Sequence, residues 1–72
     1  MATLKTSLDR ALGLYKLTDS NGETYTLNAK DDLTAIKQGC TMLVFDNGCI
    51  KRNGKDVAAL TMIDGVRMIQ LA

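Results

Sequence analysis

Four glycines directly follow an asparagine or an aspartate, and these pairs constrain the fold more than any other feature of the sequence. The pairs are Asn21-Gly22, Asn47-Gly48, Asn53-Gly54 and Asp64-Gly65. Such pairs supply the positive φ angles that tight hairpin turns require. Four turn signals within 72 residues predict a chain of short antiparallel strands.

The segments between these turns predict a single small domain of the α+β class in which strands dominate. Apolar residues at helical spacing predict a helix over residues 4–12, although its boundary with the next strand stays open. A β-hairpin over 14–28 follows, and then a short helix over 30–38 with aspartates at its start and Gly39 beyond its end. The remaining residues predict a four-stranded antiparallel meander, and closure of this meander into a small barrel is an open alternative.

The turn signals divide the meander into four strands. The third of them also fits a helix, because its alanine and leucine residues are strong helix formers. The four strands are expected at 40–45, 49–52, 56–63 and 66–71.

Keeping apolar residues opposite one another selects the register of the first hairpin. A two-residue loop would place Leu17 opposite the polar Thr26. A three-residue loop, Ser20-Asn21-Gly22, instead places Leu17 opposite Tyr25, and we therefore expect this loop. Two-residue loops are expected at the later turns, with the pairs Phe45–Ile50, Arg52–Lys55, Leu60–Ile69 and Ile63–Val66.

The two cysteines are expected to be free. In the register above, Cys40 and Cys49 lie about six strand positions apart, roughly 20 Å, which is too far for a disulfide. Neither has a second ligand at the spacing that zinc sites use. We therefore expect buried thiols in a reducing compartment, with no bound metal and no cofactor.

The composition disfavours several classes of function. The chain has no histidine, so the commonest general acid-base group is missing, and most acidic residues stand at turns or helix starts. The formal net charge of +1 gives no global attraction to nucleic acid or to an anionic membrane. No apolar run is long enough for a membrane span. We expect a soluble cytoplasmic protein that is not an enzyme and has no membrane partner.

One local basic cluster surrounds the Asn53-Gly54 turn. It consists of Lys51, Arg52 and Lys55, and Lys30 and Lys37 are candidates for a wider patch. A small nucleic-acid-binding barrel that uses this hairpin tip is therefore the alternative function. Solubilising charge on an exposed hairpin is the simpler interpretation, because Lys51 can pair with an aspartate across the strands. The three aromatic residues, Tyr15, Tyr25 and Phe45, are expected in the core rather than free for base stacking.

The last strands carry apolar residues on both faces, and this pattern predicts the favoured function. A small chain without disulfides or metals buries one sheet face in its core, and the second face needs another cover. We therefore expect a non-catalytic protein-interaction or assembly module that binds a protein partner or copies of itself. The residues expected at this interface are Met42, Val44, Ile63, Val66 and Met68.

Overall fold

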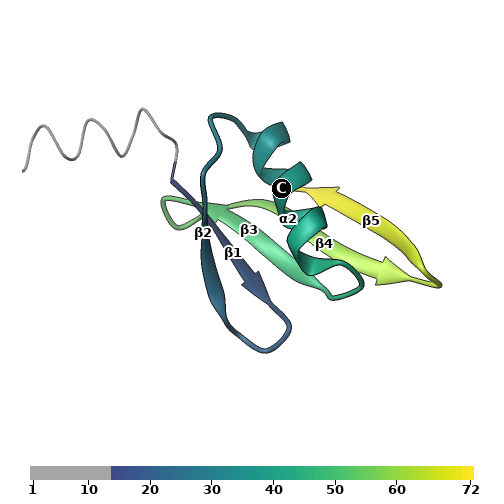
Figure 1. Cartoon of the computed structure of the whole chain (residues 1–72). Helices are drawn as coiled ribbons and strands as arrows, with labels where there is room; N and C mark the ends of the chain where they lie inside the picture. The colour runs from purple at the N-terminus through teal and green to yellow at the C-terminus, as the bar shows by residue number, and fades with distance from the viewer. Residues whose placement is uncertain (1–13) are drawn as a thin grey trace, which may run out of the picture.

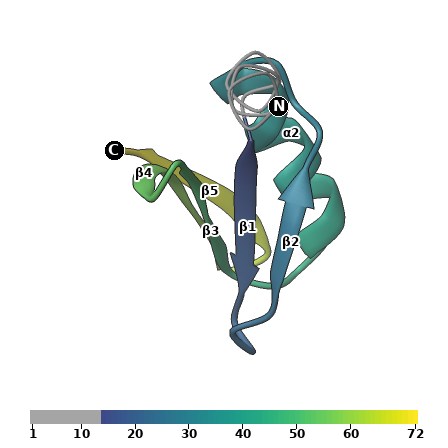
Figure 2. The ribbon, with the colours of Figure 1, turned by 90° about the vertical axis from the view of Figure 1, so that its left-hand side faces the viewer.

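The computed structural model describes residues 14–72, so the helix expected over 4–12 lies outside the described residues. The described elements are β1 (Tyr15–Asp19), β2 (Thr24–Leu27), α2 (Asp32–Leu43), β3 (Gly48–Arg52), β4 (Lys55–Ile63) and β5 (Val66–Leu71). The strands form one antiparallel sheet in the order β2-β1-β3-β4-β5, and α2 packs against one face of it (Figures 1 and 2). The expected β-rich α+β class is confirmed, but the sheet is not closed into a barrel.

The first hairpin has the predicted register. Leu17 lies opposite Tyr25, and the loop between the strands contains three residues, with Gly22 at a φ of +82°. The carboxylate of Asp19 accepts hydrogen bonds from the backbone N–H groups of Asn21 and Glu23, at 2.9 and 3.0 Å. These bonds occupy backbone donors that the loop would otherwise leave without a partner.

The last two turns also agree with the sequence. Asn53-Gly54 and Asp64-Gly65 each have two consecutive positive φ angles, as type I′ hairpin turns require. The segment for which a helix was also considered is strand β4. The pairs Arg52–Lys55, Leu60–Ile69 and Ile63–Val66 all form as predicted.

The prediction of a strand over 40–45 is wrong, because helix α2 does not end before Gly39. The helix begins after Asp31, whose carboxylate accepts a hydrogen bond from the N–H of Thr34 at 2.8 Å, and it continues to Leu43. Gly39 is buried inside it, and a Cβ there would lie 2.9 Å from Cδ1 of Ile50. Gly39 therefore does not end the helix. Its lack of a side chain lets the helix pack closely on the sheet. The meander therefore has three strands, β3 to β5, instead of four.

Asn47-Gly48 is not a hairpin turn, so the expected pairing of Phe45 with Ile50 is also wrong. Gly48 is the first residue of β3 and lies opposite Leu60. The cysteines are half-buried free thiols, one on α2 and one on β3. The separation expected between Cys40 and Cys49 assumed the pairing of Phe45 with Ile50, which does not form.

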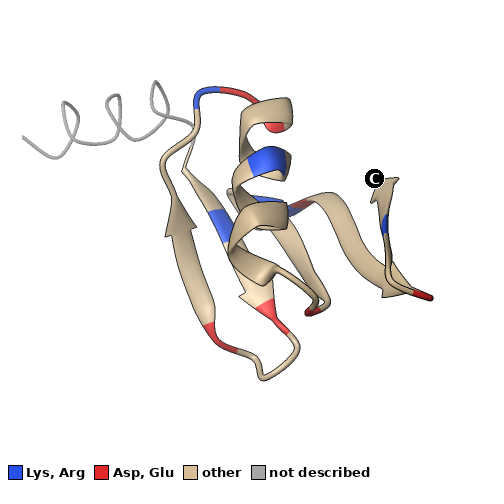
Figure 3. Cartoon of the chain, turned by 45° about the vertical axis from the view of Figure 1, so that its right-hand side comes forward, with Lys and Arg blue, Asp and Glu red and all other residues tan. Residues whose placement is uncertain are grey.

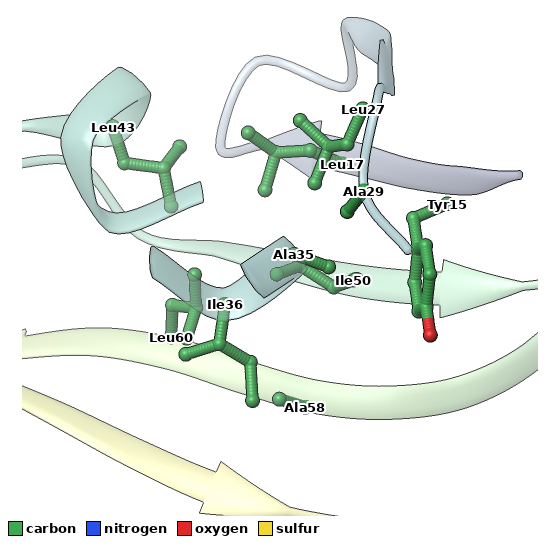
Figure 4. Packing of buried hydrophobic residues seen from close by; sticks show 10 residues of the cluster. All are labelled: Tyr15, Leu17, Leu27, Ala29, Ala35, Ile36, Leu43, Ile50, Ala58 and Leu60. Carbon is green, nitrogen blue, oxygen red and sulfur yellow. The ribbon is translucent and has the colours of Figure 1, made fainter. Parts of the chain in front are cut away.

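The core lies between α2 and the sheet strands β1 to β4 (Figure 4). Of the three aromatic residues expected there, only Tyr15 is fully buried. Tyr25 is 38% exposed and Phe45 is 78% exposed, so both expectations fail. The buried residues are Tyr15, Leu17, Leu27, Ala29, Ala35, Ile36, Leu43, Ile50, Ala58 and Leu60.

Val44 ends the helix in a conformation that a β-branched residue rarely adopts. Its φ is +55° and its ψ is −97°, while its side chain is 61% exposed. A positive φ at such a residue is strained, because Cβ crowds the neighbouring carbonyl group. The exposed side chain offers few contacts to offset this strain.

The two close-packed glycines should respond differently to alanine. At Gly48 the added Cβ would lie 2.6 Å from the backbone oxygen of Thr18, which cannot move without disturbing the sheet. We expect Gly48→Ala to lower the free energy of unfolding by about 1–3 kcal/mol. At Gly39 the nearest atoms are flexible side-chain ends, and alanine gains about 1 kcal/mol of helix propensity. Urea denaturation should therefore show a much smaller loss for Gly39→Ala, and equal losses would contradict this account.

Replacing Val44 by glycine should stabilise the chain. Strain of this kind costs about 1–3 kcal/mol, whereas the greater freedom of glycine in the unfolded chain costs about 0.5–1 kcal/mol. We expect Val44→Gly to raise the free energy of unfolding by about 1 kcal/mol in urea denaturation. A lower stability would mean that contacts of the valine side chain outweigh the backbone strain.

Candidate protein-interaction surface

Strands β4 and β5 form a hairpin that extends beyond the helix and has two differently oriented faces (Figure 1). Residues directly opposite each other in an antiparallel pair point to the same side of the sheet. On the helix face of this hairpin lie Ala58, Leu60, Met62, Arg67, Ile69 and Leu71. On the open face lie Ala59, Thr61, Ile63, Val66, Met68 and Gln70.

The helix covers only part of its face of the hairpin. Ala58 and Leu60 on β4 are buried against the helix, but their partners on β5, Leu71 and Ile69, are 68% and 46% exposed. The open face of the same hairpin is exposed as well, at Ile63, Val66 and Met68. Strand β5 therefore carries exposed apolar side chains on both of its faces.

The structure brings together three of the five residues predicted at an interface. Ile63, Val66 and Met68 share the open face of the hairpin, as their positions in the sequence indicated. Met42 is on the helix instead and lines a separate hollow with Tyr25. Val44 follows the helix on the side of the sheet that α2 covers, and it is also exposed.

The loop between α2 and β3 is hydrogen-bonded to the hairpin. The guanidinium of Arg67 donates to the carbonyl oxygens of Val44, at 2.7 Å, and Asp46, at 2.9 Å. The side-chain oxygen of Asn47 accepts from the N–H of Met62 at 2.8 Å, just beyond the last pair between β3 and β4. These bonds hold the exposed Val44 close to the helix face of the hairpin.

Sequence reasoning did not place Phe45, Ile69 and Leu71 at an interface, although all three are exposed. Phe45 was assigned to a strand that does not form. Ile69 and Leu71 share a face with Leu60 and Ala58 on β4, which are buried, whereas Ile69 and Leu71 themselves are exposed. The sequence pattern does not show that β5 lies at the edge of the sheet, beyond the reach of the helix.

The predicted basic cluster is divided between the two faces of the sheet. Lys51 points to the open face, where its Nζ lies 3.8 Å from the carboxylate of Asp56, as expected. Arg52 points to the helix face, is half-buried, and lies over the ring of Tyr15 with its Cζ 5.4 Å from the ring centre. Lys55 pairs across from Arg52 and is exposed. The neighbour of Lys51 on β1 is Lys16, so the open face has two adjacent lysines.

The other charged residues are spread over the described elements. Lys30 precedes the helix and Lys37 lies within it. Figure 3 shows positive and negative segments distributed over strands, helix and turns. The positively charged segments of the described chain therefore do not gather on one helix or strand.

A partly buried polar network surrounds the hydroxyl group of Tyr15. This hydroxyl donates to the carboxylate of Asp32 at 2.5 Å and accepts from Arg52 at 3.5 Å. Burial and the Asp32 carboxylate raise the pKa of Tyr15. Tyr25 has no such burial, but its hydrogen bond to Glu23 raises the pKa of Tyr25 to about 12.

One hollow among the described residues contains both a cysteine and an aspartate. Within residues 14–72, no group of three His, Cys, Asp or Glu side chains is placed to hold a metal ion. This hollow, of about 250 Å³ at the end of the hairpin, is lined by Cys49, Asp56, Gln70 and apolar residues. No helix in this part of the chain has the length and apolarity that a membrane crossing requires.

Comparison with known proteins does not supply a family. No protein-family model matches the chain, and no curated protein or solved structure is similar enough to count as a match.

The raised pKa values of both tyrosines should be visible in an alkaline titration. The chain has two tyrosines and no tryptophan, so tyrosinate absorbance reports on them directly. The unfolded chain releases its tyrosine protons near pH 10, before the folded chain does. Stability is therefore fully present below about pH 10 and falls as pH rises above it.

A Tyr25→Phe variant isolates the titration of Tyr15. We expect its absorbance change to begin clearly above the pH at which the urea-unfolded variant titrates. Coincident curves for the folded and unfolded variant would show that the hydroxyl of Tyr15 is neither desolvated nor hydrogen-bonded to Asp32.

Proposed function

We propose that the chain is a non-catalytic protein-interaction module that binds through the β4–β5 hairpin. The observation that carries this proposal is the exposure of apolar side chains on both faces of one hairpin. Contiguous exposed apolar surface on a small domain is typical of a binding surface, whereas single exposed apolar residues are common everywhere.

Three features support the hairpin as the binding surface. Fully burying one Val, Ile, Leu or Met side chain stabilises a complex by about 1.5–3 kcal/mol before the costs of association. The hairpin offers Ile63, Val66 and Met68 on one face and Ile69 and Leu71 on the other. The strained Val44 lies beside it, and strained residues of this kind are concentrated at functional sites.

Nucleic-acid binding through Lys51, Arg52 and Lys55 is the alternative proposal. The adjacent Lys16 and Lys51 on the open face favour it. The division of the three residues between two faces weighs against it, as do the ion pair of Lys51 and the stacking of Arg52 on an aromatic ring. We therefore place it second.

The proposed function is tested by removing apolar surface from the hairpin alone. Val66→Thr combined with Met68→Thr keeps residues that suit a strand and removes apolar area from the open face. Leu33→Gln is the matched control, because Leu33 is 61% exposed and belongs to helix α2 rather than to the hairpin. Binding is read as mass in sedimentation equilibrium and as the proteins that the tagged chain retains from a cell extract.

We expect the hairpin variant to lose about tenfold or more in affinity for a protein that both the wild type and Leu33→Gln bind. Binding should change little with added salt, whereas backbone-dominated nucleic-acid binding weakens steeply. Equal binding by all three chains would contradict the proposal. If the chain instead binds single-stranded DNA, and added salt abolishes this binding, the alternative is favoured.

A further inference from the structure

In the sheet formed by residues 14–72, strand β5 is an edge to which another strand can be added. The other edge, β2, has four residues, whereas β5 has six. Natural sheets protect exposed edges with short strands, proline or charged residues. The chain has no proline, and β5 has one charged residue, Arg67, whose guanidinium is bonded to the carbonyl groups of a loop. The edge at β5 therefore lacks these protections.

The hairpin geometry determines which backbone groups of β5 point outward. Ile63 and Val66 flank a two-residue turn and so form the first hydrogen-bonded pair with each other. Hydrogen-bonded and non-hydrogen-bonded pairs alternate along the hairpin. The N–H of Ala72 donates to the carbonyl of Val57 at 3.1 Å, which agrees with this alternation. Even-numbered residues of β5 therefore bond to β4. The N–H and C=O groups that point away from the sheet belong to Arg67, Ile69 and Leu71.

We propose that β5 pairs antiparallel with β5 of a second copy of this chain, about a two-fold axis at Ile69. The pairing joins the two five-stranded sheets into one continuous sheet. This inference rests on the proposed function and names its partner as another copy of the chain.

The outward backbone groups select this register. With the axis at Ile69, this residue lies opposite its own copy and Arg67 lies opposite Leu71, so all three outward residues find partners. An axis at Arg67 would place two like charges directly opposite each other, which is destabilising. An axis at Met68 would pair Leu71 with Gly65, whose φ of +78° removes it from the extended strand.

The side chains suit the same arrangement. On the helix face, Ile69 contacts its own copy, and the exposed Leu71 lies against the aliphatic part of Arg67. The axis is perpendicular to the sheet, so both helices lie on one side, and β5 separates each helix from the junction (Figure 1). A junction of one strand pair buries less than the roughly 1,600 Å² of a standard interface. We therefore expect a reversible dimer in the micromolar range.

Cysteine placement tests this register directly. In an Ile69→Cys variant the two cysteines form a hydrogen-bonded pair with Cα atoms about 5.5 Å apart, within the range of a disulfide. Leu71→Cys is the matched control, since Leu71 is on the same face and more exposed. Its two copies would lie four residues apart along the strands, about 14 Å. Each variant is treated with oxidised glutathione, and linked peptides are identified by mass spectrometry to exclude links through Cys40 or Cys49.

We expect at least about tenfold more covalent dimer from Ile69→Cys than from Leu71→Cys. A mixture of Met68→Cys and Gln70→Cys should form linked pairs between the two variants, since these positions lie opposite each other. Equal amounts of covalent dimer from Ile69→Cys and Leu71→Cys would overturn the register. So would a disulfide between two copies of Met68→Cys when Ile69→Cys forms none.

Sedimentation equilibrium of the unaltered chain provides the second measurement. We expect the mass to rise toward that of a dimer at high micromolar concentration. A single-chain mass throughout overturns the self-pairing. If the Val66→Thr and Met68→Thr variant still loses a captured protein in that case, the proposed function stands without the inference drawn from it.

Discussion

The width of helix α2 relative to the sheet determines which apolar side chains are buried. A helix with its side chains is about 10–12 Å wide, whereas strands lie about 4.8 Å apart, so one helix is too narrow to cover all five strands. The core lies between α2 and strands β1 to β4. Gly39 lets α2 approach Ile50 and Leu60 closely, which centres it over β3 and its neighbours. Strand β5 therefore lies beyond it, with Ile69 and Leu71 exposed.

The sequence predicted the local parts of the fold and failed where tertiary packing decides. Turn residues and alternating faces were sufficient for the registers of β1–β2 and β4–β5, because these depend on neighbouring residues. The sequence pattern predicts a helix end at Gly39 and a hairpin turn at Gly48, but both are glycines because another segment packs against them. The apolar run after Gly39 fits a buried strand and a buried helix equally well by composition. Only the contact with β3 and β4 decides between them.

The candidate surface was predicted only in part, because strand period can be read from the sequence but tertiary packing cannot. Ile63, Val66 and Met68 were assigned to one face by the period of a strand, and the structure keeps them together. Met42 was assigned with them through a strand that is a helix. The basic residues are close in sequence, but successive strand residues point to opposite faces, which divides Lys51 from Arg52. The exposed apolar side chains of the hairpin are therefore a stronger indication of a binding surface than the basic residues that are neighbours in the sequence.

The order of the strands has a consequence for how the chain folds. Strands β1–β2 and β3–β4–β5 are joined by short turns, and such hairpins form within about 1–10 μs. The pairing of β1 with β3 is different, because it joins residues such as Lys16 and Lys51 across β2 and the whole helix. Closing so long a loop costs chain entropy before any contact offsets it. We expect the folding barrier to lie at this junction, so that α2 and β1 dock onto a three-stranded unit already formed by β3, β4 and β5.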